Sequence, residues 1–419
     1  MKYFIERVDS KNFISVNMIV NVGTDHETKT DLEYAHIIEH LFAFFTSSTF
    51  PNYNDVHTLF KQYGIDFSAE THDYITKYIF ITPKKNLFKL LDILFVTIND
   101  FKIDSSIFKK ETNSVVIELK NIMESPEYLL DKKINELYYP NHSRSISIKD
   151  RIRSTNNCSI NSIMKFYKKY YNSNNICFMF CGDISEQYNK LLVKYMNPYN
   201  TNMYKPKMNL IKKLSINSNI YRVPKKDDKS YIKIYFKLQF DVFHENNYLL
   251  QCLLDILTED LDSLLYKKLR SEKGLIYSIS TDNNIDEHNS MSFISFDTDT
   301  NDTKQNILKI ISIIINCILN LENEDIDKYV KNFIYNNKLE ILKDKNCKDG
   351  EKMLDFYNTY FVFNKKKIDY YKYLEKFNQI KINNLLDFTK KNFTLENLII
   401  IYSSQYNINK DINQILKSL

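Results

Sequence analysis

The sequence predicts an α+β fold of two homologous halves, and an internal repeat is the first reason. A helical pattern at residues 166–171 runs into an apolar strand at 176–181, and the same succession recurs at 388–393 and 398–402. The matched positions of the two copies lie 222 residues apart. A constant offset near half of the chain length indicates duplication.

The second reason is that each half opens with an alternating segment, at residues 14–22 and 231–239, which predicts a strand. Strands mixed with long helices predict, for each half, a mixed and mostly antiparallel sheet with helices packed on one face. The two halves are expected to face each other across a cleft.

The boundary between the halves is predicted in a polar stretch where three prolines cluster with Asn and Lys. We therefore expect an N-terminal half at residues 1–200, a linker at 201–228 and a C-terminal half at 229–419. Each half of about 200 residues is long enough to bury a core of its own.

Residues 36 to 40 read His-Ile-Ile-Glu-His, which is the strongest chemical signal in the chain. On a helix His36 and His40 lie one turn apart on the same face, so both imidazoles can bind one metal ion. Glu39 lies beside them, where a carboxylate can act as general base toward a water molecule activated by zinc. This order of residues is the inverzincin pattern. The N-terminal half is therefore expected to bind zinc and to be catalytic.

Local signals predict a helix at this motif. Thr30 and Glu33 have the spacing of a capping box, in which each side chain accepts a hydrogen bond from the backbone of the other. Apolar residues then recur at helical spacing and predict that the helix is partly buried. They are Ala35, Ile38, Leu41, Phe42 and Phe45.

A third ligand is predicted on a second helix, where Glu111 and Glu118 lie seven residues apart and therefore on one helical stripe. A carboxylate on that stripe could complete a His-His-Glu site and leave the fourth zinc position open. Considered alone, either glutamate is more often a solvated surface residue.

With these residues the chain resembles the pitrilysin or insulinase family of zinc peptidases, in particular its half-size members, which include the mitochondrial processing peptidases. The resemblance implies one Zn²⁺ per chain, with Glu118 as its third ligand and Glu111 as a neighbouring carboxylate that orients the ligands. Two positions depart from the family, since Glu33 stands where glycine is usual and Ser68 where asparagine is usual. We attribute the first departure to capping, and the second puts one side-chain contact to substrate in doubt.

A second segment resembles the family in the C-terminal half, where Arg270, Gly274, Leu275 and Tyr277 match the pattern Arg-x-x-x-Gly-Leu-x-Tyr. The resemblance implies that Arg270 and Tyr277 hold the substrate backbone and stabilise the tetrahedral intermediate. Considered alone, they are a surface cation and one of 31 tyrosines. The C-terminal half has no His-x-x-Glu-His, so we expect it to bind no zinc and to close the substrate chamber.

Glycine is rare, with five in the chain, so each is expected where a side chain is forbidden or φ is positive. Four occur where the family also tends to have glycine, namely Gly23, Gly64, Gly182 and Gly274. Residues 64–71 resemble the edge strand of the family. This resemblance implies that a peptide substrate adds to the strand along Ser68, Ala69, Glu70 and Thr71.

These features predict a zinc-dependent endopeptidase that hydrolyses peptide bonds in extended peptides or unfolded polypeptide segments. Two alternatives stay open. One is a catalytically inactive structural or partner subunit of a heteromeric assembly of the same fold. The other is an obligate heteromer whose partner binds the substrate. Half-size members commonly pair, so a homodimer or a heterodimer is compatible with the sequence.

Charge and hydropathy restrict the other partners. The formal charge of +5 is spread among alternating Lys and Asp or Glu with no basic block, which argues against nucleic-acid binding. The most apolar predicted helix, residues 307–321, is too short to cross a bilayer, so no membrane partner is expected.

The cysteines indicate the compartment. None of the six forms a Cys-x-x-Cys pair, and Cys177 and Cys181 lie in a predicted buried strand, so reduced thiols are expected. No targeting segment is visible near the N-terminus, which favours a cytoplasmic or other reducing compartment. An excess of Asn, Lys, Ile and Tyr is typical of an AT-rich genome, and a virion location would follow if the source were a large DNA virus.

Overall fold

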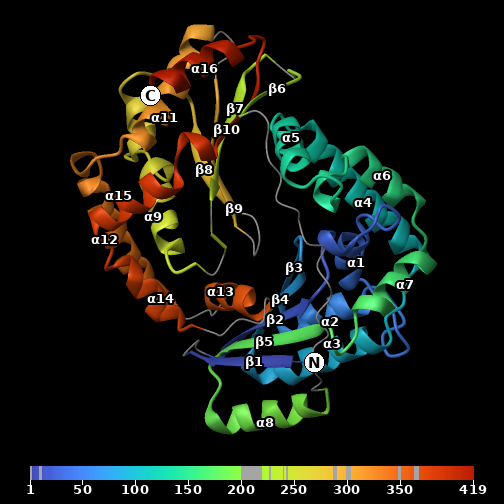
Figure 1. Ribbon diagram of the computed structural model, residues 1–419. Helices are drawn as coiled ribbons and strands as arrows, with labels where there is room; N and C mark the ends of the chain where they lie inside the picture. The colour runs from blue at the N-terminus through green and yellow to red at the C-terminus, as the bar shows by residue number, and fades with distance from the viewer. Residues whose placement is uncertain are drawn as a thin grey trace. The chain divides into compact units, whose positions relative to one another are not determined.

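The computed structural model describes residues 2–8, 12–199, 219–225, 228–238, 240–241, 244–285, 290–298, 303–347, 351–362 and 368–419. Within these ranges the strands form two five-stranded sheets with helices packed on them (Figure 1). The first sheet contains β1 (Lys2–Arg7), β2 (Phe13–Val20), β3 (Asp66–Thr71), β4 (Thr76–Pro83) and β5 (Ile176–Gly182). The second contains β6 (Ile220–Val223), β7 (Tyr231–Leu238), β8 (Ile279–Ile285), β9 (Ser290–Asp297) and β10 (Leu398–Ser403).

The helices alternate with these strands along the chain. They are α1 (Tyr34–Phe42), α2 (Asp55–Tyr63), α3 (Leu87–Asn99), α4 (Ser105–Glu124), α5 (Tyr128–Tyr138), α6 (Ile148–Asn157), α7 (Ile160–Tyr170), α8 (Glu186–Met196), α9 (Asn247–Thr258), α10 (Leu264–Tyr266), α11 (Lys304–Leu319), α12 (Asn323–Cys347), α13 (Glu351–Val362), α14 (Tyr370–Phe377), α15 (Ile382–Asn392) and α16 (Asn409–Ser418). The predicted strands at 14–22 and 231–239 are β2 and β7, and the predicted apolar helix at 307–321 is α11.

The two sheets have the same topology. The first runs in the order β1-β5-β2-β4-β3 and the second in the order β6-β10-β7-β9-β8. In each sheet one outer pair, β1 with β5 and β6 with β10, is parallel, and the other neighbours are antiparallel. The helices α7 and α15 begin at Ile160 and Ile382, so they keep the predicted offset of 222 residues. The α+β class and the duplication of the halves are therefore confirmed.

The described residues divide into two compact units that interleave along the chain. Unit 1 lies within Met1–Met123, Asn141–Asn209 and Lys343–Tyr370, and unit 2 within Glu124–Pro140, Leu210–Leu342 and Tyr371–Leu419. Helix α13 thus belongs to unit 1 and α5 to unit 2. Division of the chain into halves at residues 1–200 and 229–419 would assign each of these two helices to the other unit. An amphipathic pattern shows that a helix is covered but not by which sheet.

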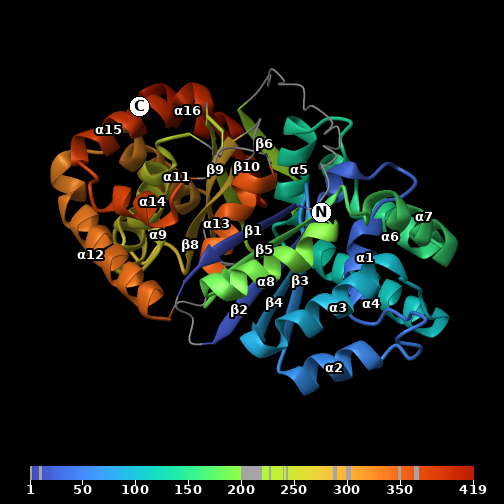
Figure 2. The same ribbon diagram turned by 90° about the horizontal axis from the view of Figure 1, so that it is seen from below.

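In unit 1, α13 covers the face of the sheet opposite to α3. Phe178 of β5 packs on Phe95 of α3 with ring centroids 5.8 Å apart, whereas the sulfur of Cys181 lies 3.9 Å from that of Met353 in α13. Residues an odd number of positions apart in a strand point to opposite faces. Strands β2 and β5 are thus buried on both sides, and Figure 2 shows α3 and α8 on the face turned away from α13. The sequence predicts helices on one face of the sheet, and α13 on the opposite face is the one addition to that prediction.

Unit 2 is built in the same way. Phe236 of β7 belongs to the large apolar cluster formed with α9, α11 and α15, and its ring lies 4.9 Å from that of Phe393. The neighbouring Tyr235 points to the other face, into a smaller cluster with Leu130 and Ile134 of α5. Counting only the described residues, each unit has one sheet face covered by several helices and the other by a single helix.

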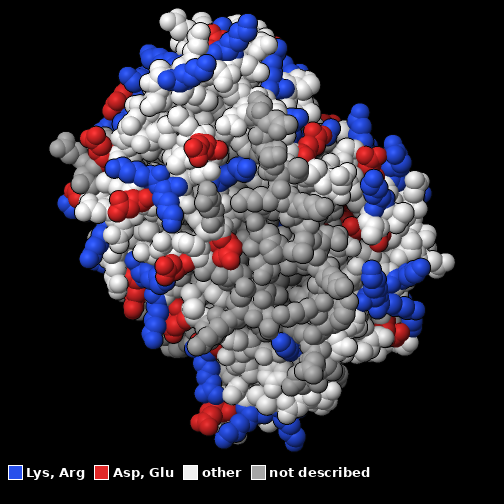
Figure 3. Space-filling model, in the orientation of Figure 1, with Lys and Arg blue, Asp and Glu red and all other residues white. Residues whose placement is uncertain are grey.

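The predicted linker at residues 201–228 lies mostly outside the described residues, although Ile220–Val223 within it form β6. Among the described residues no helix is both long and apolar enough to span a bilayer. Cys158, Cys177, Cys181, Cys252 and Cys317 are free thiols. On the face seen in Figure 3, basic and acidic side chains are interspersed over the described surface.

Two glycines support the part of unit 1 that leads into α1 and β3. A Cβ at Gly23 would lie 2.1 Å from the carbonyl oxygen of His72, so only glycine permits this approach of two backbones. Gly64 ends α2 with a left-handed φ of 62° and directs the chain toward β3. The predicted requirement for glycine is confirmed at both positions.

The short helix between β2 and α1, Thr24–His26, contains a histidine that folding keeps neutral. Burial lowers the pKa of His26 from 6.5 to about 4, and its Nδ1 accepts a hydrogen bond from the backbone N–H of Gly23 at 3.2 Å. As the pH falls, the unfolded chain binds this proton first. His26 should therefore lower the free energy of unfolding by about 3 kcal/mol as the pH falls from 6.5 to about 4.

Urea unfolding of wild type and of the His26→Gln variant between pH 7.5 and 4.5, both with a chelator present, measures this loss. Glutamine keeps a hydrogen-bond acceptor but cannot bind the proton, so its stability should fall less steeply. Parallel pH profiles for the two proteins would contradict the assignment.

Candidate metal centre

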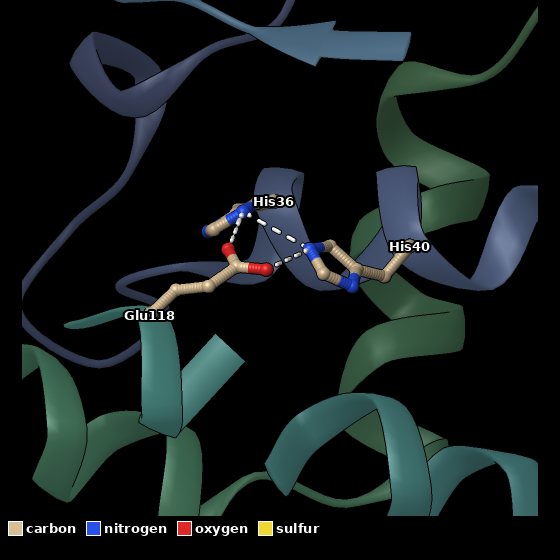
Figure 4. Close-up of side chains that lie close together, drawn as sticks. All are labelled: His36, His40 and Glu118. Carbon is tan, nitrogen blue, oxygen red and sulfur yellow. Dashed lines mark hydrogen bonds and ion pairs between the residues drawn. The ribbon is translucent and has the colours of Figure 1, made fainter. Parts of the chain in front are cut away.

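Three side chains from two helices of unit 1 converge on one point (Figure 4). The Nε2 atoms of His36 and His40, both on α1, lie 3.2 Å apart. The carboxylate of Glu118 on α4 reaches them, with Oε2 at 3.2 Å from Nε2 of His36 and Oε1 at 3.5 Å from Nε2 of His40. Within the described residues these three form the only group of this kind that could hold a metal ion.

The far side of each imidazole contacts a second carboxylate. Nδ1 of His36 lies 3.0 Å from Oε2 of Glu33, and Nδ1 of His40 lies 3.3 Å from Oε2 of Glu111. An ionised carboxylate can only accept, so each Nδ1 can donate a hydrogen to its carboxylate, and a neutral ring that does so keeps a lone pair on Nε2 for a metal ion. Glu111 therefore lies next to His40, and its orienting role stays a prediction.

These donors fit a zinc ion. Two Nε2 atoms and a carboxylate face one another within 4.8 Å, so one cation placed among them could contact all three side chains. Two imidazoles with one carboxylate form a three-ligand set found in hydrolytic zinc sites. Glu118 is the most exposed ligand, with 47% of its side chain accessible, so the point of convergence is open to solvent.

The predicted capping box of Thr30 and Glu33 is wrong. Helix α1 begins at Tyr34, and the hydroxyl of Thr30 interacts with that of Thr28, at 3.0 Å. The N-terminal end of α1 is held instead by Glu27, whose carboxylate accepts hydrogen bonds from the backbone N–H groups of Glu33 at 2.9 Å and Ala35 at 3.1 Å.

Glu33 precedes α1 with a φ of 70°, in the left-handed region. A residue with a Cβ costs about 1–2 kcal/mol in this conformation, whereas glycine adopts it without penalty. This explains in physical terms why the related family usually has glycine here. The contacts of the Glu33 side chain offset this cost.

Glu33 is part of a buried charged cluster. Its Oε1 lies 2.5 Å from Nη1 of Arg151 on α6, and the same nitrogen lies 3.9 Å from Oε2 of Glu27. Burial raises the pKa of Glu27 well above its ordinary value, and the charge of Glu33 adds to this. Burial also acts to raise the pKa of Glu33, but the hydrogen bond with His36 and the charge of Arg151 outweigh it and lower the pKa. The pKa of Glu33 is therefore held below that of Glu27.

Glu39 connects the metal centre to the edge of the sheet. Its Oε2 accepts a hydrogen bond from the hydroxyl of Thr71 at 3.0 Å. Thr71 is the last residue of β3, which pairs with β4 on one side and forms the edge of the first sheet. The predicted edge strand is thus confirmed as an edge.

The other residues predicted on this strand lie along it in alternation. Ser68 and Glu70 are exposed, whereas Ala69 is partly buried. Glu70 pairs with His72 at 2.8 Å and with Lys77 at 3.3 Å. The strand therefore presents polar side chains and an unpaired backbone edge next to Glu39.

Arg270 lies in the π-helical turn Lys267–Ser271 of unit 2, and Tyr277 follows that turn. Nη1 of Arg270 donates to the backbone carbonyl of Tyr277 at 2.8 Å, and its guanidinium lies 5.0 Å from the centroid of the Tyr277 ring. Gly274 between them has a φ of 58°. The phenol is available to a ligand, because 75% of Tyr277 is exposed.

Sequence reasoning did not identify Glu27, Arg151 or the contact of Glu33 with His36. Glu27 and Arg151 belong to no motif, and their roles depend on the packing of α6 against the start of α1. For Glu33 a signal was present, because a charged residue occupies a position where glycine is usual.

Comparison with known proteins identifies the family of the chain. The family model described as Insulinase (Peptidase family M16) matches residues 3–150, and the model described as Peptidase M16 inactive domain matches residues 157–332. The chain belongs to the insulinase (M16) family of peptidases. The resemblance drawn from the sequence is thus confirmed. The first match contains both histidines and Glu118, and the second contains Arg270 and Tyr277.

Relatives in the family carry zinc-protease names. The chain is 23% identical over 305 residues to the uncharacterized zinc protease YmxG of Bacillus subtilis, and the alignment covers 73% of each protein. A crystal structure of a protease from Helicobacter pylori matches with a TM-score of 0.79 at 19% identity over 96% of each chain. A peptidase M16 inactive domain from Pseudomonas fluorescens also matches with a TM-score of 0.79, at 10% identity, over 97% of this chain and 95% of that one. These structures share the fold.

Proposed function

We propose that this protein is a zinc-dependent endopeptidase of the inverzincin type that cleaves extended peptides or unfolded polypeptide segments. The observation that carries this proposal is the convergence of His36, His40 and Glu118 within 4.8 Å, with Glu39 on the same helix as the two histidines. Membership of the peptidase family and the zinc-protease names of relatives support it.

His36 and His40 would bind one Zn²⁺ through Nε2, and Glu118 would bind it through its carboxylate. Zinc, when bound, polarises the scissile carbonyl group and lowers the pKa of a water molecule so that it becomes a nucleophile. Glu39 would take a proton from the attacking water on Oε1, while Oε2 keeps the hydrogen bond from Thr71 at 3.0 Å. The same carboxyl group would then deliver the proton to the leaving amine.

The substrate would bind as an additional strand on β3. This strand is an edge, and its last residue contacts Glu39, so a peptide paired with it would pass next to the base. Backbone hydrogen bonds along Ser68, Ala69, Glu70 and Thr71 would give affinity that depends little on the sequence of the peptide. Only an extended segment can pair in this way, which favours unfolded substrates.

In this proposal residues 1–200 supply the catalytic site, and residues 229–419 supply Arg270 and Tyr277 but no metal ligand. The alternative is an inactive or partner subunit, which is favoured by the match of residues 157–332 to a domain described as inactive. That match leaves out His36, His40 and Glu118. Measuring the mass in solution would show whether a homodimer or a complex with another chain has to be considered.

The Glu118→Gln variant tests the metal site. An amide binds zinc far less well than a carboxylate, so zinc affinity should fall. Loss of a residue that only orients a ligand typically costs roughly 10–100-fold, and loss of a ligand should cost at least that much. Elemental analysis after dialysis against a chelator of known affinity measures this. The matched control is Glu124→Gln, at the exposed end of the same helix, which should retain zinc as wild type does. One zinc ion per chain in Glu118→Gln would indicate that Glu111 is the third ligand instead of Glu118.

A further inference from the structure

We propose that Glu33 is a positioning residue for the metal centre, which fixes the tautomer and the ring orientation of His36. The inference rests on the proposed zinc site and adds to it a residue that the metal-ligand motif does not contain. It is drawn from the contacts of one buried carboxylate at an unusual backbone position.

The first observation is the direct contact between the two side chains. Oε2 of Glu33 lies 3.0 Å from Nδ1 of His36, and the opposite ring nitrogen faces Oε2 of Glu118 at 3.2 Å. Donation from Nδ1 to this acceptor would hold the hydrogen of the neutral ring on Nδ1 and leave the lone pair on Nε2 directed at the proposed metal position. This is the arrangement in which an outer carboxylate makes an imidazole a better ligand.

The second observation is that Glu33 is itself held in place. Its Oε1 contacts Arg151 at 2.5 Å, its backbone N–H donates to Glu27 at 2.9 Å, and only 6% of its side chain is accessible. Both carboxylate oxygens are thus engaged, one with the arginine and the other with His36. A side chain fixed at both ends can restrict the rotation of the ring that it contacts.

The third observation is the backbone conformation. Among the described residues, three other than glycine have a positive φ, namely Asn12, Glu33 and Asn141. Asparagine tolerates this region well, whereas glutamate has no such preference. Glycine would relieve the backbone at residue 33 but would remove the carboxylate that contacts His36. The cost of the conformation is consistent with a functional use of this side chain.

The fourth observation is that the two histidines have similar contacts. Glu111 on α4 contacts Nδ1 of His40 at 3.3 Å and is also nearly buried. Each ligand histidine therefore has a carboxylate behind it, but the two come from different elements. Glu33 precedes its histidine by three residues, immediately before the helix that carries it, so it can act without any movement of α4.

Zinc affinity tests the proposal, measured by competition with a chelator of known affinity in wild type, Glu33→Gly and Glu33→Gln. Glu33→Gly should bind zinc about 10–100-fold more weakly than wild type. Glu33→Gln should lose less, because its amide oxygen can still accept the hydrogen from Nδ1. The matched control is Asn141→Gly, which places glycine at another positive φ, of 63°, and should bind zinc as wild type does.

The visible spectrum of the Co²⁺-substituted proteins gives a second readout. The d–d bands report the ligand geometry, so they should change in Glu33→Gly and stay close to wild type in Glu33→Gln. If Glu33→Gly does not fold, Glu33→Asn replaces it, since asparagine accepts the backbone conformation but is too short to reach His36.

The outcomes separate this inference from the proposed function. A wild type that binds no zinc would overturn both. Wild-type binding together with unchanged affinity and spectrum in the variants that remove the carboxylate would overturn the role of Glu33 alone. In that case Glu33 serves to neutralise Arg151, and Glu33→Gln, which removes the charge without relieving the backbone, should lower the melting temperature more than Glu33→Gly does.

Discussion

Replacing Glu39 with glutamine should lower peptide hydrolysis by about 10²- to 10⁴-fold while the protein stays folded and keeps its zinc. Glutamine has the same size, and its amide oxygen can still accept the hydrogen bond that the hydroxyl of Thr71 gives to Glu39 at 3.0 Å. It cannot accept a proton from the attacking water. The variant therefore separates the base from the metal site that surrounds it.

The measurement is steady-state hydrolysis of an unstructured fluorogenic peptide, with zinc content and melting temperature determined on the same preparation. Glu124→Gln serves as the control, because it makes the same chemical change at an exposed position of α4. Turnover of Glu39→Gln close to that of wild type would refute the assignment of the base.

The histidine motif could be predicted because helical periodicity alone determines it. Residues four apart on a helix face the same side, so His36 and His40 had to lie together once α1 formed. The position of Glu118 depends on the packing of α4 against α1, which is not local. Its identification from the sequence relied on the resemblance to the family, and the structure places its carboxylate 3.2 Å from His36.

The repeat could be predicted for a similar reason. Two copies of one helix–strand unit have the same spacing of apolar residues, and α7 and α15 start at matching positions, as do β5 and β10. The placement of α5 and α13 could not be predicted in this way. Each has an apolar face, but a hydrophobic pattern does not specify which of two similar sheets will bury it.

The wrong capping box shows how local rules fail at this site. Thr30 and Glu33 have the right spacing, but the side chain of Glu33 is engaged by His36 and Arg151 and cannot return to the backbone of Thr30. The N–H groups at the start of α1 are satisfied by Glu27 instead. Local preference is overridden where several buried charges meet, and such positions are often functional.

The second large effect is expected from the C-terminal half. Tyr277→Phe should lower turnover by the factor that corresponds to losing roughly 2–4 kcal/mol of transition-state stabilisation. The resemblance to the family implies that the phenol hydroxyl donates to the oxyanion of the tetrahedral intermediate, and phenylalanine lacks this donor. The side chain is 75% exposed and its backbone carbonyl is held by Arg270 at 2.8 Å, so the loss of the hydroxyl should not change the fold. Zinc content and melting temperature should stay near the wild-type values.

Arg270→Ala should act mainly by raising KM, because the guanidinium is assigned to the substrate backbone and also supports the main chain at Tyr277. Tyr335→Phe is the control, since this tyrosine of unit 2 is also exposed, at 62%, and has no assigned role. Kinetics of one fluorogenic peptide with all four proteins decide the matter. Equal kcat and KM in wild type, Tyr277→Phe and Arg270→Ala would mean that the Arg-x-x-x-Gly-Leu-x-Tyr segment has a structural role only, and that the residues of unit 1 perform the catalysis alone.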